Sequence, residues 1–289
     1  MNAVTGLAPS TSAADRYAVF GNPIAHSRSP AIHARFAVQT GQAIVYEKRL
    51  APLDGFAAAI GAFIAEGGRG ANVTVPFKLE AYALATRLTP RAAAAGAVNT
   101  LCFDADGIVG DNSDGVGLVT DLAINAGVQI RGRRVLLLGA GGAAQGVMLP
   151  LLDAQPSRLV IANRTPDKAA AIASRFNLGA PVGLQVVACT LDALDSADAP
   201  FDIVINATAA SLSDAVPDVP ACVFGERTLA YDMMYASAPT AFMRFAASRG
   251  ASVRDGLGML VEQAAEAFFV WRGVRPDTAA VLADLRAAL

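Results

Sequence analysis

The sequence has few residues of the kinds that bind metals or form disulfides. Its 289 residues include two histidines and three cysteines. Cys102, Cys189 and Cys222 lie far apart and outside any C-x-x-C spacing, which argues against a disulfide framework or a zinc site, so we expect them to be small buried hydrophobic residues. His26 and His33 have no third ligand beside them in the sequence. We therefore predict no metal site.

Charge and long apolar runs are also scarce. Charged residues make up 17% of the chain, and the formal net charge of -2 offers no basic surface to nucleic acid or to an anionic membrane. No run of 18 uncharged apolar residues predicts a membrane span, and residues 1–15 lack the basic start and apolar core of a signal peptide. We expect a globular cytoplasmic protein, monomeric or homodimeric, that binds a small molecule.

The N-terminal part of the chain alternates between apolar strands and helices. We expect strands at 16–23, 43–50, 70–77, 96–103 and 108–112 and helices at 29–41, 54–68 and 78–88. Ser29 is the expected N-cap of the first helix, and Pro76 and Phe77 are expected to end the third strand. This alternation predicts an α/β fold, with a mostly parallel sheet covered by helices on both faces.

The same alternation restarts in the second half of the chain. A helix at 114–127 leads into a short apolar strand, a glycine turn and a helix at 134–154, and further strands and helices continue to residue 256. We therefore expect one domain at 1–115 and a second at 116–255. Two helices within 256–289 follow without another strand, and the pattern alone allows them to pack on either domain.

A glycine turn opens the second domain. Gly139, Ala140, Gly141, Gly142 and Ala143 lie between an apolar strand and a helix, as dinucleotide-binding βαβ units require. Glycine lets backbone N–H groups approach a pyrophosphate, whose charge suits the positive end of the helix. A structural turn without a ligand is the alternative. The strand that follows the helix favours a dinucleotide site.

The end of that second strand indicates which dinucleotide binds. NAD sites usually carry an acid there, but this chain has Asn163, Arg164, Thr165 and Lys168. A guanidinium beside a hydroxyl and a lysine suits the 2′-phosphate of NADP through charge-assisted, bidentate hydrogen bonds. An ordinary solvated helix start is the alternative. We predict NADP rather than NAD.

Polar residues of the first domain gather where its strands end. Ser27 and Ser29 lie at a helix N-terminus, where hydroxyls and free N–H groups favour a carboxylate. Capping by Ser29 alone is the alternative, although it leaves Ser27 unexplained. Asn72, Thr74, Lys78, Asn99 and Asp114 follow at later strand ends. Neutral donors and acceptors with one cation and one anion suit a small polyhydroxylated acid as substrate.

These residues carry a resemblance that extends from about Tyr17 to Trp271. The chain resembles the shikimate dehydrogenases of aromatic amino-acid biosynthesis in the order and approximate spacing of eight motifs: FGNPIAHSRSPAIH, GANVTVPFK, GAVNT, GDNSDG, GAGGAA, NRT, YDMMY and DGLGMLVEQAAEAF. Two positions depart from the common pattern. The loop after "NAT" has Ala209, Ala210 and Ser211, and Lys168 stands where many relatives have arginine, which weakens the expected hold on NADP.

The resemblance implies an oxidoreductase that reversibly reduces 3-dehydroshikimate to shikimate with NADPH, in a cleft between a substrate domain and a Rossmann domain. It implies that Ser27 and Ser29 hold the carboxylate, and that Lys78 and Asp114 are the catalytic pair. The ring and its hydroxyls would be fixed by Thr74, Asn99, Asp114, Tyr235 and Gln263. Met233 and Gly256 would line the nicotinamide, and the C-terminal helices would return to the first domain.

The chemistry of Lys78 agrees with this implication. Hydride delivery to a carbonyl carbon leaves negative charge on oxygen, which a protonated lysine can stabilise and then neutralise with a proton. A structural ion pair between Lys78 and Asp114 is the alternative. Two other functions stay open: a quinate/shikimate dehydrogenase that accepts NAD, and a catalytically silent Rossmann binding or regulatory protein.

Overall fold

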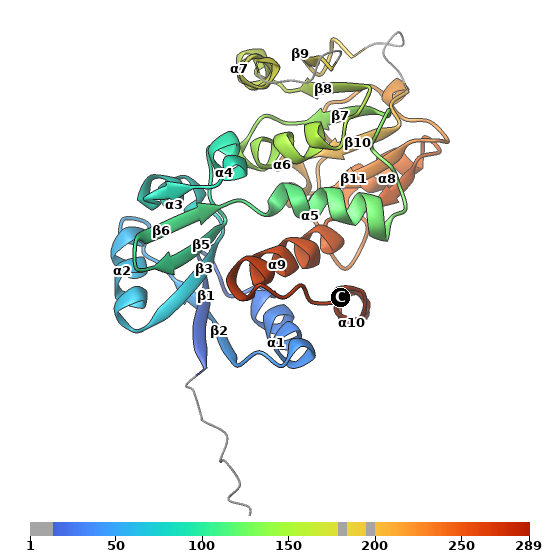
Figure 1. Cartoon of the computed structure of the whole chain (residues 1–289). Coiled ribbons are helices and arrows are strands. Elements are labelled where there is room, and N and C mark those ends of the chain that lie inside the picture. Colours follow the sequence, from blue (N-terminus) through green and yellow to red (C-terminus); the bar gives the residue numbers. More distant parts are fainter. Residues whose placement is uncertain (1–13, 179–183, 195–199) are drawn as a thin grey trace, which may run out of the picture.

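Two six-stranded sheets form the two lobes of the molecule. The computed structural model describes residues 14–178, 184–194 and 200–289, so most of the N-terminal stretch 1–15 lies outside the described residues. Figure 1 shows the lobes with α5 (Asp114–Thr120) and α9 (Leu257–Arg272) between them. Each described helix is too short or too polar to cross a lipid bilayer.

The first sheet is mixed. Its strands are β1 (Asp15–Gly21), β2 (Ile44–Leu50), β3 (Gly68–Val73), β4 (Arg87–Leu88), β5 (Thr100–Asp104) and β6 (Gly107–Asp111), in the order β2-β1-β3-β5-β6-β4. Strands β2, β1 and β3 are parallel, whereas β5 is antiparallel to both its neighbours. The helices of this lobe are α1 (Ser29–Thr40), α2 (Phe56–Ala65), α3 (Lys78–Leu84) and α4 (Pro90–Ala95).

Three local predictions for this lobe are wrong. Ser29 is the first residue of α1 and Arg28 is its N-cap, without a side-chain capping bond, while the Ser29 N–H donates to Ser27 Oγ at 3.3 Å. Strand β3 ends at Val73 and not at Pro76, since proline has no N–H for a ladder and the chain turns there, with Phe77 N–H donating to Thr74 O at 3.0 Å. Helix α3 ends at Leu84, because β4 follows and pairs with β6.

The second sheet is wholly parallel and has the Rossmann order. Its strands are β7 (Arg134–Leu138), β8 (Arg158–Ala162), β9 (Val186–Cys189), β10 (Ile203–Asn206), β11 (Leu229–Asp232) and β12 (Ser252–Arg254), in the order β12-β11-β10-β7-β8-β9. The helices of this lobe are α6 (Gly142–Asp153), α7 (Pro166–Asn177) and α8 (Ala241–Ala247), with short helical turns η1 (Asp121–Asn125), η2 (Ala210–Ser213) and η3 (Ala221–Val223). The predicted α/β fold with a Rossmann-type domain is confirmed.

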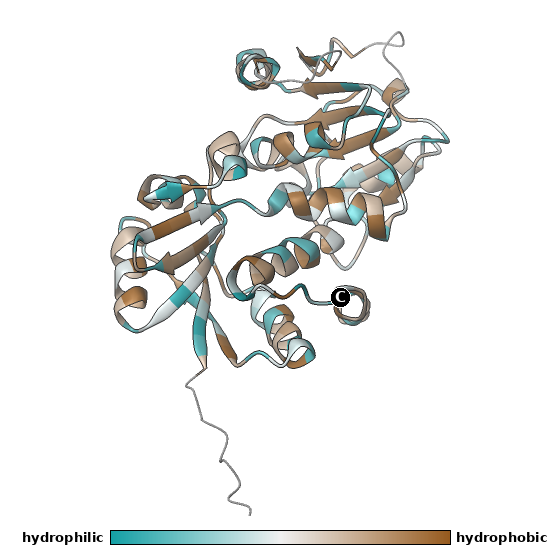
Figure 2. Cartoon of the chain, in the orientation of Figure 1, coloured by the Kyte–Doolittle hydropathy of each residue, from teal (hydrophilic) through white to brown (hydrophobic). Residues whose placement is uncertain are grey.

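The strands of this sheet are buried on both faces. Leu137 and Ile161 belong to one hydrophobic cluster, while their neighbours Leu136 and Val160 belong to the cluster on the opposite face. Figure 2 accordingly shows β7, β8 and β10 as almost entirely hydrophobic. Their carboxyl ends, where β7 and β10 lie side by side, are the place where open α/β sheets bind ligands.

The C-terminal helices return to the first lobe, as the resemblance implied. Phe268 of α9 and Val281 of α10 (Ala279–Ala287) pack in one cluster with Ile32 and Phe36 of α1. Helix α9 also packs along α5, and its Met259 belongs to the hydrophobic cluster of Leu137 and Ile161, so α9 contacts both lobes.

The prediction that the cysteines are buried is wrong. Cys222 is exposed, while Cys102 and Cys189 are partly buried. Cys222 lies in the one-turn helix η3 at the surface, where Val223 supplies the buried side chain.

Candidate active site

A cavity of about 390 Å³ lies between the lobes, and the structure brings together there every residue predicted for the substrate. Its lining includes the predicted substrate residues Ser27, Ser29, Asn72, Thr74, Lys78, Asn99, Asp114, Tyr235 and Gln263, and the predicted nicotinamide neighbours Met233 and Gly256. They come from both lobes and from α9. The cavity size suits a small polar molecule.

Lys78 and Asp114 form an ion pair in this cavity. Lys78 is the first residue of α3 and Asp114 the first of α5, and the turn after β3 and the end of β6 bring the two helix starts together. Lys78 Nζ lies 2.5 Å from Asp114 Oδ2, and the side chains are 28% and 10% exposed. The ammonium is thus held by a nearly buried carboxylate while it remains accessible from the cavity.

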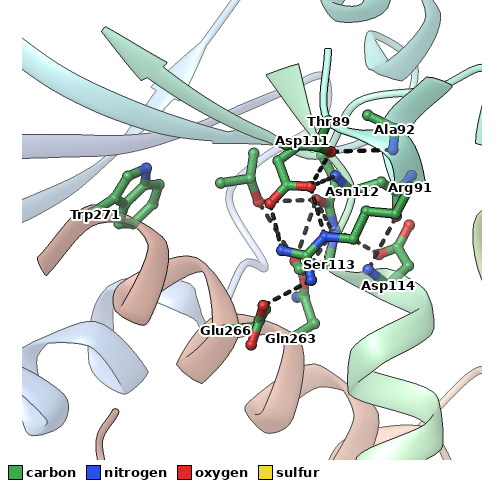
Figure 3. Close-up of polar contacts among 12 residues, drawn as sticks. Thr89, Arg91, Ala92, Asp111, Asn112, Ser113, Asp114, Gln263, Glu266 and Trp271 are labelled. Atoms are coloured by element: carbon green, nitrogen blue, oxygen red, sulfur yellow. Dashed lines mark hydrogen bonds and ion pairs between the residues drawn. The ribbon is translucent and has the colours of Figure 1, made fainter. Parts of the chain in front are cut away.

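Asn99 fixes the other side of Asp114. Its Nδ2 donates to Asp114 Oδ1 at 2.8 Å and to Gln263 Oε1 at 3.1 Å. Its Oδ1 accepts from the Ser113 N–H at 2.9 Å. Figure 3 shows Ser113, Asp114 and Gln263 converging beside the end of β6. One amide therefore ties together the strand end, the start of α5 and α9.

Asn72 lines the cavity, yet its donors are used within the protein. Its Nδ2 donates to Asn99 O and Thr100 Oγ1, and its Oδ1 accepts from the Tyr46 hydroxyl at 2.7 Å.

His33 stacks on Tyr46 with a centroid distance of 4.1 Å between the two rings. Burial lowers the pKa of His33 to about 3, so this imidazole is neutral. No group of three described His, Cys, Asp or Glu side chains is placed to hold a metal ion.

Arg28 was missed by the sequence reasoning. It lies between Ser27 and Ser29, lines the same cavity and is exposed. Burial raises the pKa of Tyr235, although the positive charge of Arg28 opposes that shift. The opening of the cavity therefore carries a cation beside the two hydroxyls. The position of a basic residue between two serines at a helix start was the sequence signal that could have identified Arg28.

The wall beside Met233 is tightly built. A Cβ on Gly256 would lie 2.1 Å from Met233 O, so only glycine fits there. At the carboxyl end of β10, Ser211 Oγ donates to Asp232 Oδ2 at 2.6 Å. The departure at Ala209, Ala210 and Ser211 thus keeps a hydroxyl that fixes this loop to β11.

The glycine turn offers open space for a dinucleotide. Gly139 has a φ of 106°, and a Cβ there would lie 3.2 Å from the backbone of Ala207. Cβ atoms on Gly141 and Gly142 would meet nothing within 4 Å. The start of α6 therefore presents its backbone N–H groups to an open cradle, which fits a pyrophosphate.

A second cavity, of about 520 Å³, adjoins this cradle. Its lining is Ala140, Gly141, Gln145, Lys168, Ala171, Ile172 and Arg175. Of the predicted cofactor residues, Gly139, Gly142, Ala143, Asn163, Arg164 and Thr165 are not in this lining; Arg164 and Thr165 are exposed at the start of α7. Arg175, which the sequence reasoning missed, adds a second cation two turns beyond Lys168. Two cations beside open backbone donors fit a phosphorylated dinucleotide.

Comparisons with known proteins identify the family. Three family models match: the shikimate dehydrogenase substrate binding domain at residues 19–101, shikimate / quinate 5-dehydrogenase at 121–213 and the shikimate 5′-dehydrogenase C-terminal domain at 256–286. A protein of Herminiimonas arsenicoxydans named shikimate dehydrogenase (NADP(+)) is 66% identical over 95% of this chain and 98% of its own. The chain belongs to the shikimate dehydrogenase family.

Other shikimate dehydrogenases and their structural relatives agree with this assignment. A shikimate dehydrogenase (NADP(+)) of Cupriavidus taiwanensis is 59% identical, with 99% of this chain and 98% of that protein covered. The crystal structure of an Ael1 enzyme from Pseudomonas putida is 49% identical with a TM-score of 0.89, covering 94% of this chain and 98% of that one. Shikimate 5-dehydrogenase from Thermus thermophilus, solved with NADP(H) and shikimate, is 34% identical with a TM-score of 0.82, covering 95% and 100%. The predicted resemblance and oxidoreductase class are confirmed.

Proposed function

We propose that the chain reduces 3-dehydroshikimate to shikimate with NADPH, reversibly, in the pathway to aromatic amino acids. Family membership supports the reaction, and close relatives are named as NADP(+) enzymes. The observation that carries the proposal is the Lys78–Asp114 pair, which lies in one cavity with the donors and acceptors that a carboxylated, hydroxylated ring requires.

In the proposed mechanism NADPH, when bound, supplies the hydride. Lys78 stabilises the negative charge that develops on the substrate oxygen and then donates a proton to it. Asp114 holds the ammonium in place, since one of its oxygens contacts Lys78 and the other is bonded to Asn99. In the reverse direction Lys78 returns to the protonated form by taking the proton of the substrate hydroxyl.

The remaining residues bind and orient. Ser27 and Ser29 hold the substrate carboxylate at the start of α1, and Thr74, Tyr235 and Gln263 contact the ring and its hydroxyls. The glycine turn would hold the pyrophosphate of NADP, and Arg164, Thr165, Lys168 and Arg175 would hold its 2′-phosphate. Met233 and Gly256 would line the nicotinamide. We assign the substrate domain to 1–115 together with 256–289, and the Rossmann domain to 116–255, in a cytoplasmic monomer or homodimer.

The test is a steady-state assay of alcohol oxidation. Purified chain is given shikimate or quinate with NADP or NAD, and NADPH or NADH formation is followed by absorbance. We expect shikimate with NADP to give by far the highest kcat/KM. Equal use of quinate or of NAD would favour a quinate/shikimate dehydrogenase of relaxed specificity, and absence of shikimate-dependent reduction would refute the proposal.

A further inference from the structure

Arg91 lies between two buried carboxylates that stand beside the active-site cavity. Its Nε donates to Asp111 Oδ1 at 2.6 Å, and its Nη2 bonds Asp111 Oδ2, which makes the contact bidentate. Its Nη1 donates to Glu266 Oε1 at 2.7 Å. Figure 3 shows Arg91 reaching from the α4 side toward both acids. Arg91 is not among the described residues that line the cavity.

The Asp111 side of this contact supports the turn that carries Asp114. Asp111 Oδ1 accepts the N–H of Asn112 at 2.7 Å, and Asn112 Oδ1 accepts the N–H of Asp114 at 3.1 Å. The N–H of Ser113, between them, is accepted by Asn99 Oδ1 at 2.9 Å. The backbone N–H groups of three consecutive residues thus donate to side chains. The first of these acceptors is the Asp111 carboxylate, which Arg91 binds.

The Glu266 side supports the helix that carries Gln263. Glu266 lies three residues after Gln263 on α9, so the two side chains are neighbours on one face of the helix. Gln263 Oε1 accepts from Asn99 Nδ2 and from Ser113 Oγ, at 3.1 and 3.4 Å. A shift of Glu266 along the helix axis would therefore move Gln263 relative to the turn at Ser113.

Arg91 and Arg275 carry two positive charges that balance the two negative charges of Asp111 and Glu266. Burial by itself would raise the pKa of Asp111, but hydrogen bonds from Arg91 and Thr89 outweigh it and hold that pKa below its usual range. Arg275 provides a second cation for Glu266 but does not reach Asp111. A buried ion pair adds little net stability compared with apolar packing, so its presence here points to the geometry that it imposes.

We propose that Arg91 is a positioning residue for the reaction. By holding Asp111 and Glu266 at the same time, its guanidinium fixes the turn bearing Asp114 against the helix bearing Gln263. The inference rests on the proposed function, because Asp114 and Gln263 are assigned there to the catalytic pair and to the substrate.

The deciding variant is Arg91→Lys, and Arg91→Gln is the more disruptive comparison. An ammonium keeps the charge but cannot present a planar fork to two carboxylates at once. A displacement of reacting groups by about 1 Å costs up to about 100-fold in rate, so we expect the rate constant for hydride transfer to fall about 10- to 100-fold in Arg91→Lys. Arg91→Gln leaves Asp111 without a cation and destabilises the fold. If Arg91→Gln does not fold, Arg91→Lys alone decides the question.

The measurement is a stopped-flow single turnover of enzyme-bound NADPH with 3-dehydroshikimate. Its amplitude counts the competent enzyme, and its rate constant reports the chemistry. We expect Arg91→Lys to keep the amplitude and lose rate, with the affinity for NADP by calorimetry unchanged. Wild-type enzyme in the same experiment reports on the proposed function separately.

Arg275→Gln is the matched control, because Arg275 contacts the same Glu266 without reaching Asp111. We expect this variant to keep the wild-type rate constant. A wild-type rate constant in folded Arg91→Lys, or an equal loss of rate in Arg275→Gln, would overturn the proposal and leave the cluster a purely structural one.

Discussion

Replacing Lys78 by alanine removes the proposed proton donor and leaves the surrounding site in place. Lys78 Nζ contacts Asp114 Oδ2 at 2.5 Å, and no other hydrogen bond or ion pair ties its ammonium to the described residues. Asp114 keeps its bond from Asn99 at 2.8 Å. Because the Lys78 side chain is 28% exposed, water can solvate the carboxylate that loses its partner. We therefore expect Lys78→Ala to fold.

The loss in rate can be sized from the two roles of the ammonium. General acid–base help from a positioned side chain is worth about 10²–10⁴-fold, which is about 3–5 kcal/mol of transition-state stabilisation. Electrostatic stabilisation of a developing oxyanion by one donor is worth about 10²–10³-fold, and one group acting in both ways does not supply the full product of the two. We expect kcat to fall about 10³- to 10⁴-fold.

The assay follows NADPH consumption with 3-dehydroshikimate, together with calorimetric binding of NADP. Lys78 is not in the lining of the cavity formed by Gly141 and Lys168, so the affinity for NADP should be unchanged. Lys48→Ala is the control, since Lys48 is another lysine of the first lobe whose Nζ bonds the backbone oxygen of Ala25. A kcat of Lys78→Ala close to that of Lys48→Ala would refute the catalytic assignment and leave a structural ion pair.

Three further predictions concern cofactor choice, stability and pH. Arg175→Gln should raise the KM for NADP about 3- to 10-fold and leave the KM for NAD unchanged, which kinetics with both cofactors would check; parallel changes would contradict a phosphate contact. Asp121→Ala removes the fully buried partner of Arg254 and Tyr231 and should cost about 3–5 kcal/mol in urea unfolding, and a much smaller cost would show that the site relaxes. The pKa of His33 is about 3 in the folded chain against 6.5 in the unfolded chain, so between these values only the unfolded chain binds the proton, and stability falls as the pH drops from about 6.5 through about 3. His33→Phe should make the free energy of unfolding, measured in urea, less dependent on pH in this range. An unchanged pH dependence would contradict the prediction.

Local patterns were enough to predict the α/β fold and part of the cavity lining, whereas Met233, Tyr235, Gly256 and Gln263 were found only through the family resemblance. A parallel sheet covered by helices on both faces follows from short, mostly apolar strands such as β7 and β8 separated by helices, because only such a sheet buries both faces of these strands. Lys78 and Asp114 could be found because each follows a strand, and Asn99 directly precedes β5, which is antiparallel to β3, so all three lie at the same edge of the sheet. The boundaries were predicted less accurately, as the early end of β3 at Val73 shows.

Contacts between distant side chains could not be predicted from one sequence. Arg91 and Glu266 are 175 residues apart, and their pairing depends on the return of α9 to the first lobe. Helix α4 itself escaped the pattern, because its alanines have no amphipathic period and only its ends carry signals, namely Thr89 and Pro90 at the start and Gly96 after the last residue. Arg175 was passed over because an arginine late in a helix is normally a solvated C-terminal cation.

The proposed roles of Lys78 as proton donor and of Asp114 as the residue that holds it follow from the number of contacts that fix each side chain. Asp114 is fixed at its backbone N–H by Asn112, at Oδ1 by Asn99 and at Oδ2 by Lys78. Lys78 is tethered by Asp114 alone among the described residues, at the end of a flexible side chain. Because Asp114 is held at its backbone N–H and at both carboxylate oxygens, its carboxylate keeps its orientation and holds the Lys78 ammonium in place. The positive charge that stabilises the developing oxyanion is therefore in position before the reaction starts. The same rigidity explains why the residues behind Asp114, and not only those that contact the substrate, should affect the rate.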